Sequence, residues 1–260
     1  MRKMLAIFLA AMLAVLCCSA AFAEETPRKG GELVVAMSFE PDTMNVYATH
    51  LMGDIQAMVV EGLLVPNGDM EYEPVLATEV PTVENGGIVM NDDGTMDITY
   101  HLVDNVYWHC GEKFTSHDVL VTWQTLHDEA WDCESKDGVY DIDSIECPDD
   151  LTVVCHYNTV TPDFAQTLFT FGIMPAHDIE GADMNDPNNA YNSSPCGTGP
   201  YKFVEWNAGE NIKLTRNENY WREGAYMDGV TILFVPDENT RITMLKAGEI
   251  DFTAGISYIN

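Results

Sequence analysis

Three turn sequences flanked by alternating apolar and polar residues constrain the fold more than any other feature of this chain. They are NDDG at residues 91–94, PDD at residues 148–150 and NAGE at residues 207–210. Turns rich in Asn, Asp, Pro and Gly between stretches of period two are typical of β-hairpins. We therefore expect three hairpins, and a chain in which antiparallel strands form much of the structure.

Other apolar stretches predict the remaining strands. Residues 31–39 are rich in Val, Leu and Met and lie between Gly30 and Pro41, which is typical of a buried strand. Together with the hairpins, the pattern predicts strands at residues 31–39, 96–102, 142–146, 151–157, 201–206, 212–216, 230–235 and 250–253.

Helical spacing occurs in three places. Residues 54–64 carry apolar side chains at the spacing of an amphipathic helix. Thr115 with Asp118 three residues later forms a capping box, which predicts a helix that continues to about Ala130. A short helix over residues 237–247 should end at Gly248. The polar residues 183–194 predict a loop or a boundary between parts of the chain. Strands and helices mixed in this way indicate an α+β fold.

The first segment predicts export. Arg2 and Lys3 precede an apolar run over residues 4–16, and Ala21-Phe22-Ala23 fits a cleavage site. The run is shorter than the about 20 apolar residues that cross a bilayer. We therefore expect residues 1–23 to be a cleaved signal peptide. A lipid anchor on Cys17 or Cys18 is the alternative, although neither follows a small residue.

Acidic residues dominate the charge. The chain has 42 Asp and Glu against 12 Lys and Arg, for a formal net charge of −30, and all the acidic residues follow residue 23. This balance argues against nucleic-acid binding, which requires basic patches. It fits a solvated surface that keeps an exported protein soluble. Attraction of a cationic ligand is the alternative.

Five cysteines follow the predicted signal peptide. Export permits disulfides, and the odd number leaves at least one cysteine free or paired between chains. Cys110 with Cys133 is the first candidate pair because both flank the capped helix. Cys147 and Cys155 flank the turn at residues 148–150, but in a tight hairpin Cys155 would face Asp143, so we do not expect that pair.

Six collinear segments together resemble the family 5 extracellular solute-binding proteins of ABC importers, which include peptide-, dipeptide- and nickel-binding members. These segments are SFEPDTMN (38–45), VVEGLL (59–64), HLVDNVYWHCGEKFTSHDV (101–119), CGTGPYKFVEW (196–206), LTRNENYW (214–221) and VPDENTRITMLKAGEID (235–251).

The resemblance implies lobe one of a two-lobed periplasmic-binding-protein-like clamshell with an inserted hairpin-rich subdomain, the second lobe being largely missing. Such clamshells close on a ligand by hinge motion. The implied organisation is residues 24–70 as the first part of lobe one, 71–190 as the inserted subdomain, 191–252 as lobe one continued, and 253–260 as the start of a crossover.

The resemblance also places a ligand cleft. Its first wall is a loop that would bind an extended peptide through its backbone. The residues of this loop are Tyr47, Ala48, Thr49, His50, Leu51 and Met52. Trp131 and Tyr140 are candidates for a second wall, because aromatic side chains give large, rigid contact areas. An ordinary surface loop and core packing are the respective alternatives.

Other site chemistry has little support in the sequence. Residues 197–200 (GTGP) lead into a strand rather than a helix, so we expect a close backbone crossing and not a phosphate site. His101, His109, Cys110 and His117 lack paired ligand spacing, so we expect no metal site. No Gly-x-Ser-x-Gly nucleophile elbow occurs, and we expect neither an enzyme nor a cofactor.

The resemblance therefore implies the exported substrate-binding component of an ABC transporter, which captures peptides or similar small solutes and delivers them to importer permeases. Nickel or metal-chelate binding on the same fold is one alternative. A truncated exported interaction protein that binds no solute is another. We expect a periplasmic or cell-surface location, with membrane contact only through the transporter or a lipid anchor.

Overall fold

Strands from both ends of the sequence meet in one sheet of five strands. The computed structural model describes residues 28–49, 53–162, 164 and 168–257. The chain divides after Gly30, and every element described below belongs to the part that begins at Gly31. The sheet has the order β11-β1-β10-β9-β8. Its strands are β1 (Glu32–Met37), β8 (Tyr201–Asn207), β9 (Asn211–Arg216), β10 (Gly229–Phe234) and β11 (Phe252–Thr253).

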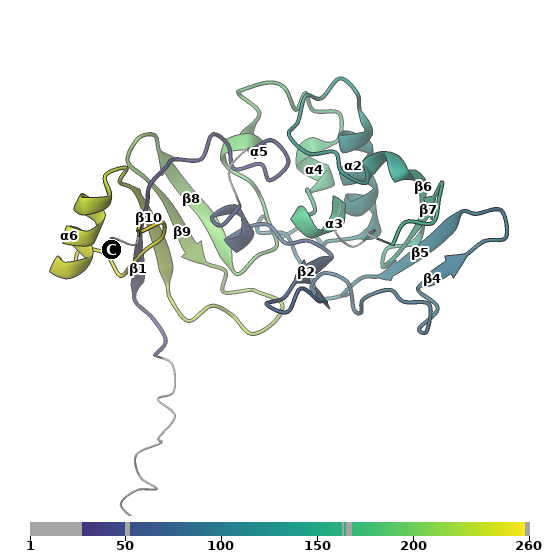
Figure 1. Cartoon of the computed structure of the whole chain (residues 1–260), viewed down its shortest axis with the longest axis horizontal. Coiled ribbons are helices and arrows are strands. Elements are labelled where there is room, and N and C mark those ends of the chain that lie inside the picture. The colour runs from purple at the N-terminus through teal and green to yellow at the C-terminus, as the bar shows by residue number, and fades with distance from the viewer. Residues whose placement is uncertain (1–27, 50–52, 163, 165–167, 258–260) are drawn as a thin grey trace, which may run out of the picture. The chain divides into compact units, whose positions relative to one another are not determined.

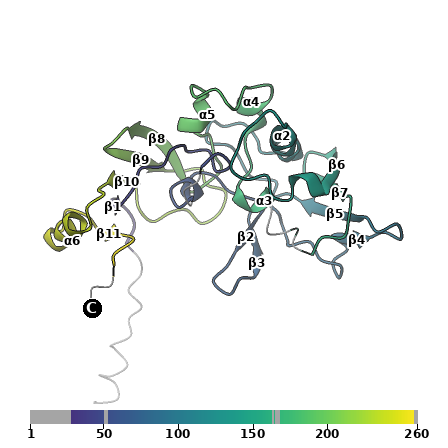
Figure 2. The ribbon, with the colours of Figure 1, turned by 45° about the horizontal axis from the view of Figure 1, so that its top comes forward.

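The register of this sheet joins segments that are far apart in the chain. β1 lies parallel to both β10 and β11, with Val34 opposite Thr231 and Val35 opposite Phe252. β8 and β9 form an antiparallel hairpin, and β9 pairs antiparallel with β10. Helix α6 (Glu238–Ala247) connects β10 to β11 and lies beside β11 (Figures 1 and 2). Its amino end is capped by Asp237, and Gly248 ends it in the left-handed conformation.

A second sheet is built entirely from antiparallel neighbours. Its order is β4-β5-β7-β6, with β4 (Ile88–Met90), β5 (Met96–His101), β6 (Ile142–Asp149) and β7 (Thr152–Tyr157). Helix α2 (Ser116–His127) packs against β6 and β7 and against α4 (Ala176–Ile179). The buried side chains of this sheet and of α2 belong to the larger of two apolar clusters, which includes Ile98, Tyr100, Val119 and Val153.

The smaller elements connect these layers. A hairpin of β2 (Leu64–Pro66) and β3 (Tyr72–Pro74) stands apart from both larger sheets. The short helices are η1 (Gln56–Met58), η2 (Val139–Asp141), α3 (Leu168–Phe171) and α5 (Ala190–Ser193). A second apolar cluster, which includes Met37, Ile55, Ile212 and Val230, lies on the five-stranded sheet.

All three predicted hairpins are confirmed, as β4–β5, β6–β7 and β8–β9. The capping box of α2 is also confirmed, since the Asp118 carboxylate accepts a hydrogen bond from the backbone N–H of Thr115 at 2.8 Å. The predicted loop over residues 183–194 is partly wrong, because residues 190–193 form α5 with Asn189 as its N-cap.

The amphipathic helix predicted over residues 54–64 is wrong. Only η1 is helical there, and the chain then extends into β2. The backbone carbonyls beyond η1 bind other segments: Val59 accepts from Gly199, Glu61 from Ile173, and Leu63 from Val75 and Ala77. A helix needs these carbonyls for its own N–H groups, so tertiary pairing prevents its growth.

The predicted Cys110–Cys133 pair and the predicted register beside Cys155 both need correction. The predicted Cys110–Cys133 disulfide is wrong, because all five cysteines in the described part of the chain are free thiols. Cys155 faces Ile145 and not Asp143, because register shifts in β6 displace the pairing that a tight hairpin would give.

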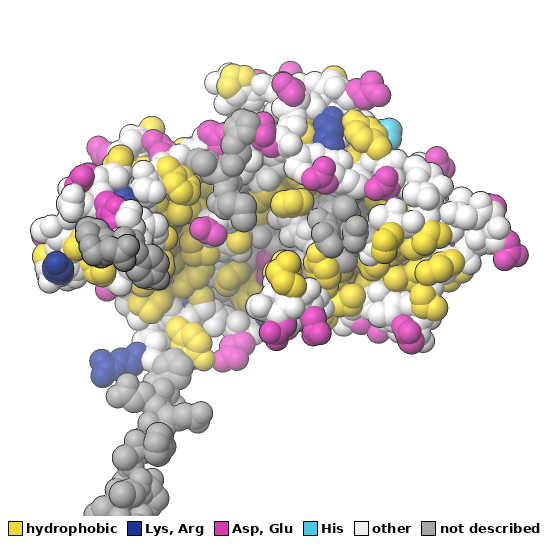
Figure 3. Space-filling model, viewed as in Figure 1, with side chains coloured by type: hydrophobic (Ala, Val, Ile, Leu, Met, Phe, Trp, Pro, Cys, Tyr) yellow, Lys and Arg dark blue, Asp and Glu magenta, His cyan; other side chains and the backbone are white. Residues whose placement is uncertain are grey.

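The surface shown in Figure 3 has acidic side chains spread over it in small groups, between patches of apolar side chains. Among the described residues, no helix is long and apolar enough to cross a membrane.

Candidate functional site

Tyr47, the first residue of the predicted cleft loop, points into the protein. Its side chain is buried, its hydroxyl donates a hydrogen bond to the carbonyl of Gly172, and its ring meets Phe171 edge-on at 6.1 Å. Burial raises the pKa of this phenol well above its ordinary value. The Tyr47 backbone is also used within the protein, since its N–H donates to Asn45 Oδ1 at 3.1 Å and its carbonyl accepts a hydrogen bond from the N–H of Glu134. Tyr47 therefore anchors the start of the predicted loop.

The next two residues are held by local hydrogen bonds. The backbone N–H of Ala48 donates to the carbonyl of Asn45 at 3.1 Å, and the Thr49 hydroxyl donates to the Asp42 carboxylate at 2.6 Å. These bonds fix how the loop leaves the segment after β1. His50, Leu51 and Met52 lie outside the described residues.

The structure brings the two predicted walls into contact. The backbone N–H of Glu134 donates to the carbonyl of Tyr47 at 3.0 Å, so the cleft loop adjoins the segment that carries Trp131 and Tyr140. The two aromatic residues differ in setting. Trp131 is only 4% exposed, whereas Tyr140 is 48% exposed and meets the His127 ring at 5.3 Å. Tyr140 is thus a surface aromatic and Trp131 a buried one.

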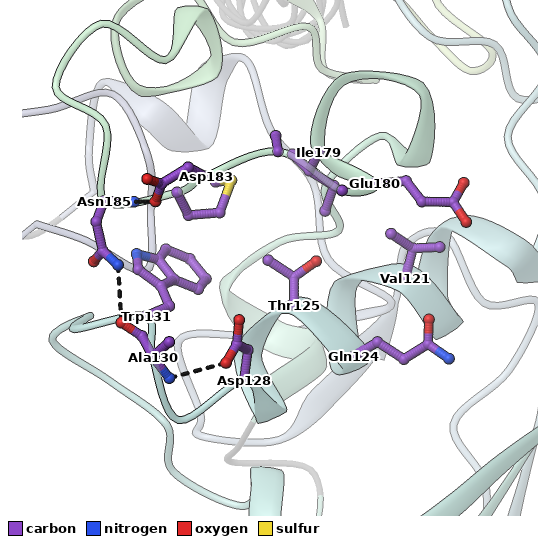
Figure 4. A pocket seen from close by; sticks show the side chains of 13 residues that line it. Val121, Gln124, Thr125, Asp128, Ala130, Trp131, Ile179, Glu180, Asp183 and Asn185 are labelled. Atoms are coloured by element: carbon purple, nitrogen blue, oxygen red, sulfur yellow. Dashed lines mark hydrogen bonds between the residues drawn. The ribbon is translucent and has the colours of Figure 1, made fainter.

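Trp131 lines a cavity of about 260 Å³ between the carboxyl end of α2 and residues 179–185 (Figure 4). Asn185 closes one side: its amide donates to the carbonyl of Ala130 at 2.8 Å and accepts from the N–H of Asp132 at 3.1 Å. The lining combines the Trp131 indole with carboxylates and amides. Pockets that hold a whole drug-sized ligand occupy about 300–1,000 Å³, so this cavity suits a side chain or another small group.

Glu61 forms a polar network that the sequence analysis did not find. Its carboxylate, only 8% exposed, accepts hydrogen bonds from Thr198, Tyr220, Trp221 and Arg222. The Arg222 guanidinium also lies 4.7 Å from the centre of the Trp221 ring. An acidic residue within the apolar run VVEGLL was the signal in the sequence, because a buried carboxylate requires partners.

The Glu61 network borders a second cavity, of about 530 Å³. Trp108, His109, Lys202 and Asn217 line it together with Tyr220 and Trp221. Because Glu61 ties the end of η1 to the loop between β9 and β10, its four donors hold distant segments together. We assign the network a structural role on this geometry.

His109 is neutral in this environment. Its Nε2 donates to the carbonyl of Gly199 at 3.0 Å, and its Nδ1 accepts from the N–H of Gly197 at 3.3 Å. This arrangement needs the proton on Nε2 and none on Nδ1. Burial lowers the pKa of His109 to about 4, which agrees with the neutral form. Both ring nitrogens are used within the protein, so His109 is not available as a metal ligand.

The predicted backbone crossing at residues 197–200 is confirmed. The N–H of Gly199 donates to the carbonyl of Val59 at 2.9 Å. A Cβ added at Gly197 would lie 1.8 Å from the same carbonyl oxygen, and one added at Gly199 would lie 2.6 Å from that of Met58. Only glycine permits so close an approach.

Residues 71–260 match the model of a protein family described as bacterial extracellular solute-binding proteins, family 5. The chain belongs to this family. The predicted fold class is confirmed as well: the chain is an α+β structure that corresponds to the N-terminal portion of two-lobed solute-binding proteins.

Two curated relatives show the extent of the likeness. Protein XP55 of Streptomyces lividans is 31% identical over 84% of this chain and 38% of its own length. The oligopeptide-binding protein AppA of Bacillus subtilis is 28% identical over 87% of this chain and 41% of its own length. The chain therefore spans about two fifths of the length of these relatives.

Solved structures are also similar to this chain over less than half of their own length. AppA of Bacillus subtilis in complex with a nonapeptide has a TM-score of 0.77 at 27% identity, over 86% of this chain and 44% of AppA. NikZ of Campylobacter jejuni in complex with Ni(L-His) has a TM-score of 0.74 at 26% identity, over 84% of this chain and 42% of NikZ.

Proposed function

We propose that the chain is the exported substrate-binding component of an ABC transporter and captures peptides or similar small solutes for import. The observation that carries the proposal is the likeness of its fold to AppA with a bound nonapeptide. DppA of Helicobacter pylori, in complex with the peptide STSA, supports it with a TM-score of 0.72 at 28% identity. The protein binds its solute without chemical change and is not an enzyme.

The proposed solute surface consists of the loop at residues 47–52 and the segment that adjoins it. The loop contributes backbone groups to an extended peptide, the mode in which main-chain bonds give affinity and side-chain pockets give specificity. The cavity beside Trp131 is the pocket on this side, and Tyr140 is an exposed aromatic contact. The bond from Glu134 to Tyr47 supports this grouping because it holds the two segments next to each other.

Export and partners belong to the same proposal. The signal peptide at residues 1–23 takes the protein across the inner membrane, and importer permeases receive the loaded protein. Family 5 proteins are described as extracellular, which supports this location. The amino-terminal segment lies outside the described residues.

A nickel or metal chelate is the second candidate ligand. The observation that favours it is the likeness to NikZ in complex with Ni(L-His). The net charge of −30 is compatible with a cationic ligand, but it identifies no particular one.

The decisive experiment is a titration of the mature protein, as its gene encodes it, with a peptide library and with nickel–histidine. Calorimetry and mass spectrometry of the bound ligands are the readouts. We expect at least one peptide class to bind with a dissociation constant of about 1 μM or lower. If the protein binds nickel–histidine and no peptide, its proposed ligand is a metal chelate and not a peptide. If it binds neither, the result favours the alternative of an exported interaction protein that binds no solute.

A further inference from the structure

Three soft metal-ligand atoms from separate chain segments meet at one place outside the proposed solute surface. They are Cys110 Sγ, His177 Nε2 and Cys196 Sγ, and all three lie within 4.8 Å of one another. Cys110 Sγ is 3.1 Å from His177 Nε2. Cys110 lies in the turn after Trp108, between β5 and α2. His177 lies in α4, and Cys196 precedes β8. No spacing in the sequence indicates this group, because its members are 67 and 19 residues apart.

The backbone holds the two cysteines side by side. The N–H of His109 donates to the carbonyl of Gly197 at 2.8 Å, and the N–H of Gly197 donates to His109 Nδ1 at 3.3 Å. Each of these residues is the direct neighbour of one cysteine. Gly197 is itself fixed against Val59, where no side chain fits. The approach of the two thiols therefore follows from the same crossing that the glycines permit.

His177 is positioned independently of the cysteines. The N–H of Ala176, the first residue of α4, donates to the Asp118 carboxylate at 2.9 Å. The Trp108 ring meets the His177 ring edge-on, with centroids 6.1 Å apart. Helix and ring are thus held by contacts that do not involve a ligand, so the imidazole is preorganised beside the thiols.

The donor set determines the chemical class of the ligand. Two thiols and an imidazole are the ligands of zinc and of other soft or borderline cations, whereas calcium and magnesium prefer oxygen. Ligand atoms around a tetrahedral zinc ion lie about 3.6–3.8 Å apart, so small side-chain rotations would bring these three to binding distance. Asp178 Oδ1 is 3.9 Å from His177 Nε2 and offers a nearby carboxylate for the fourth position.

We propose that Cys110, His177 and Cys196 form a binding site for zinc or a similar soft divalent cation. Asp178 or water completes the coordination. Cys110 and His177 are exposed to solvent, so an ion can reach the site from outside. A bound ion would tie α4 to the two crossing segments. The site differs in place and in ligand atoms from the proposed solute surface, so each can be tested without the other.

Cobalt titration of the reduced, mature protein as its gene encodes it tests the site. We expect one cobalt ion per chain, with thiolate-to-cobalt charge-transfer absorption that zinc abolishes. Cys110→Ser and Cys196→Ser should each lower that absorption, because one of the two thiolates is lost, and the double variant should remove it. Each single variant should weaken zinc binding in a chelator competition by about tenfold or more. His177→Gln should weaken zinc binding to a similar extent while the cobalt spectrum keeps its thiolate band.

Matched controls are Cys133→Ser and Cys147→Ser, which change free thiols elsewhere and should leave cobalt and zinc binding unchanged. The proposal is overturned if reduced wild type gives no thiolate-to-cobalt band. It is equally overturned if Cys110→Ser and Cys196→Ser bind zinc like the wild type. Isolation of the exported protein with a Cys110–Cys196 disulfide and no metal would also overturn it. Peptide titration of Cys110→Ser separates this result from the proposed transport function, because peptide binding should persist.

Discussion

At the residue scale, Glu61 shows how a charge is accommodated inside this fold. Four side chains donate to one buried carboxylate, and only Arg222 among them carries a charge. Removal of a buried carboxylate that accepts several hydrogen bonds leaves its donors without partners, which costs more than the net contribution of the bonds themselves.

We therefore expect Glu61→Ala to lower the free energy of unfolding by about 3 kcal/mol, and Glu61→Gln to lower it by about half as much. Glutamine keeps one acceptor oxygen, whereas alanine keeps none. Urea denaturation followed by tryptophan fluorescence measures both. Glu205→Gln is the matched control, because Glu205 pairs with Lys213 on the surface and its replacement should hardly move the midpoint. Equal midpoints for Glu61→Ala and wild type would contradict the structural role of the network.

Tyr140 and Trp131 differ in how well their substitution separates an effect on binding from an effect on folding. Trp131 is buried, and truncation of a buried tryptophan typically costs about 3–5 kcal/mol of stability, so its loss would mix folding with binding. Tyr140 is half exposed and can be truncated with little effect on the fold. It is the cleaner probe of the second wall.

We expect Tyr140→Ala to weaken peptide binding about tenfold, or about 1.4 kcal/mol, because an aromatic contact is lost while the backbone contacts remain. Calorimetric titration of the mature protein measures this change, and thermal melting should show no change in stability. Tyr107→Ala is the control, since Tyr107 is 52% exposed and lies outside the proposed surface. If both variants bind peptide like the wild type, Tyr140 is an ordinary surface residue.

At the element scale, the sequence predicted the hairpins correctly because their turns depend mainly on the residues of the turn itself. The turns at residues 91–94 and 207–210 specified their hairpins because Asn, Asp and Gly favour the turn whatever lies around it. The helix expected at residues 54–64 failed because the carbonyls of Val59, Glu61 and Leu63 bind distant segments. Apolar spacing carries no information about such bonds. The group of Cys110, His177 and Cys196 was not predicted for the same reason, since only the folded chain brings these residues together.

At this scale, a single substitution tests the backbone crossing at residues 197–200 most directly. We expect Gly197→Ala to destabilise the protein by more than about 4 kcal/mol, because the new Cβ would lie 1.8 Å from the carbonyl oxygen of Val59. Expression yield and urea midpoints measure the effect. Gly224→Ala is the control, because no atom lies within 4 Å of the Cβ that it adds and its backbone angle is ordinary. A stable Gly197→Ala protein would show that the two segments can separate at little cost.

At the scale of the whole molecule, the resemblance to family 5 solute-binding proteins predicted more of the fold than the periodicity of apolar residues did. The alternation of apolar residues indicated an α+β fold, but it could not pair β1 with β10 across about 200 residues of chain. The order of six family segments implied lobe one of a two-lobed clamshell, whereas the pairing of β1 with β10 became evident only in the folded chain. The ligand loop stays a prediction, because the structure shows how Tyr47, Ala48 and Thr49 are held and not what they bind. The acidic excess is a property of the whole molecule, which the sequence analysis attributes to a solvated surface.

That excess should make stability depend on salt. With 42 acidic and 12 basic residues, most carboxylates have no cation to pair with, and their mutual repulsion is relieved when the chain unfolds. Dissolved ions screen this repulsion over about 10 Å at 0.1 M ionic strength. We therefore expect the melting temperature of the mature protein to rise as sodium chloride increases from about 0.01 to 0.15 M, measured by differential scanning calorimetry at neutral pH. Potassium chloride should act equally, since the effect is one of ionic strength, whereas sucrose at matched osmolarity should not reproduce it. A melting temperature that falls over this range would mean that favourable ion pairs such as Arg222 with Glu61 outweigh the general repulsion.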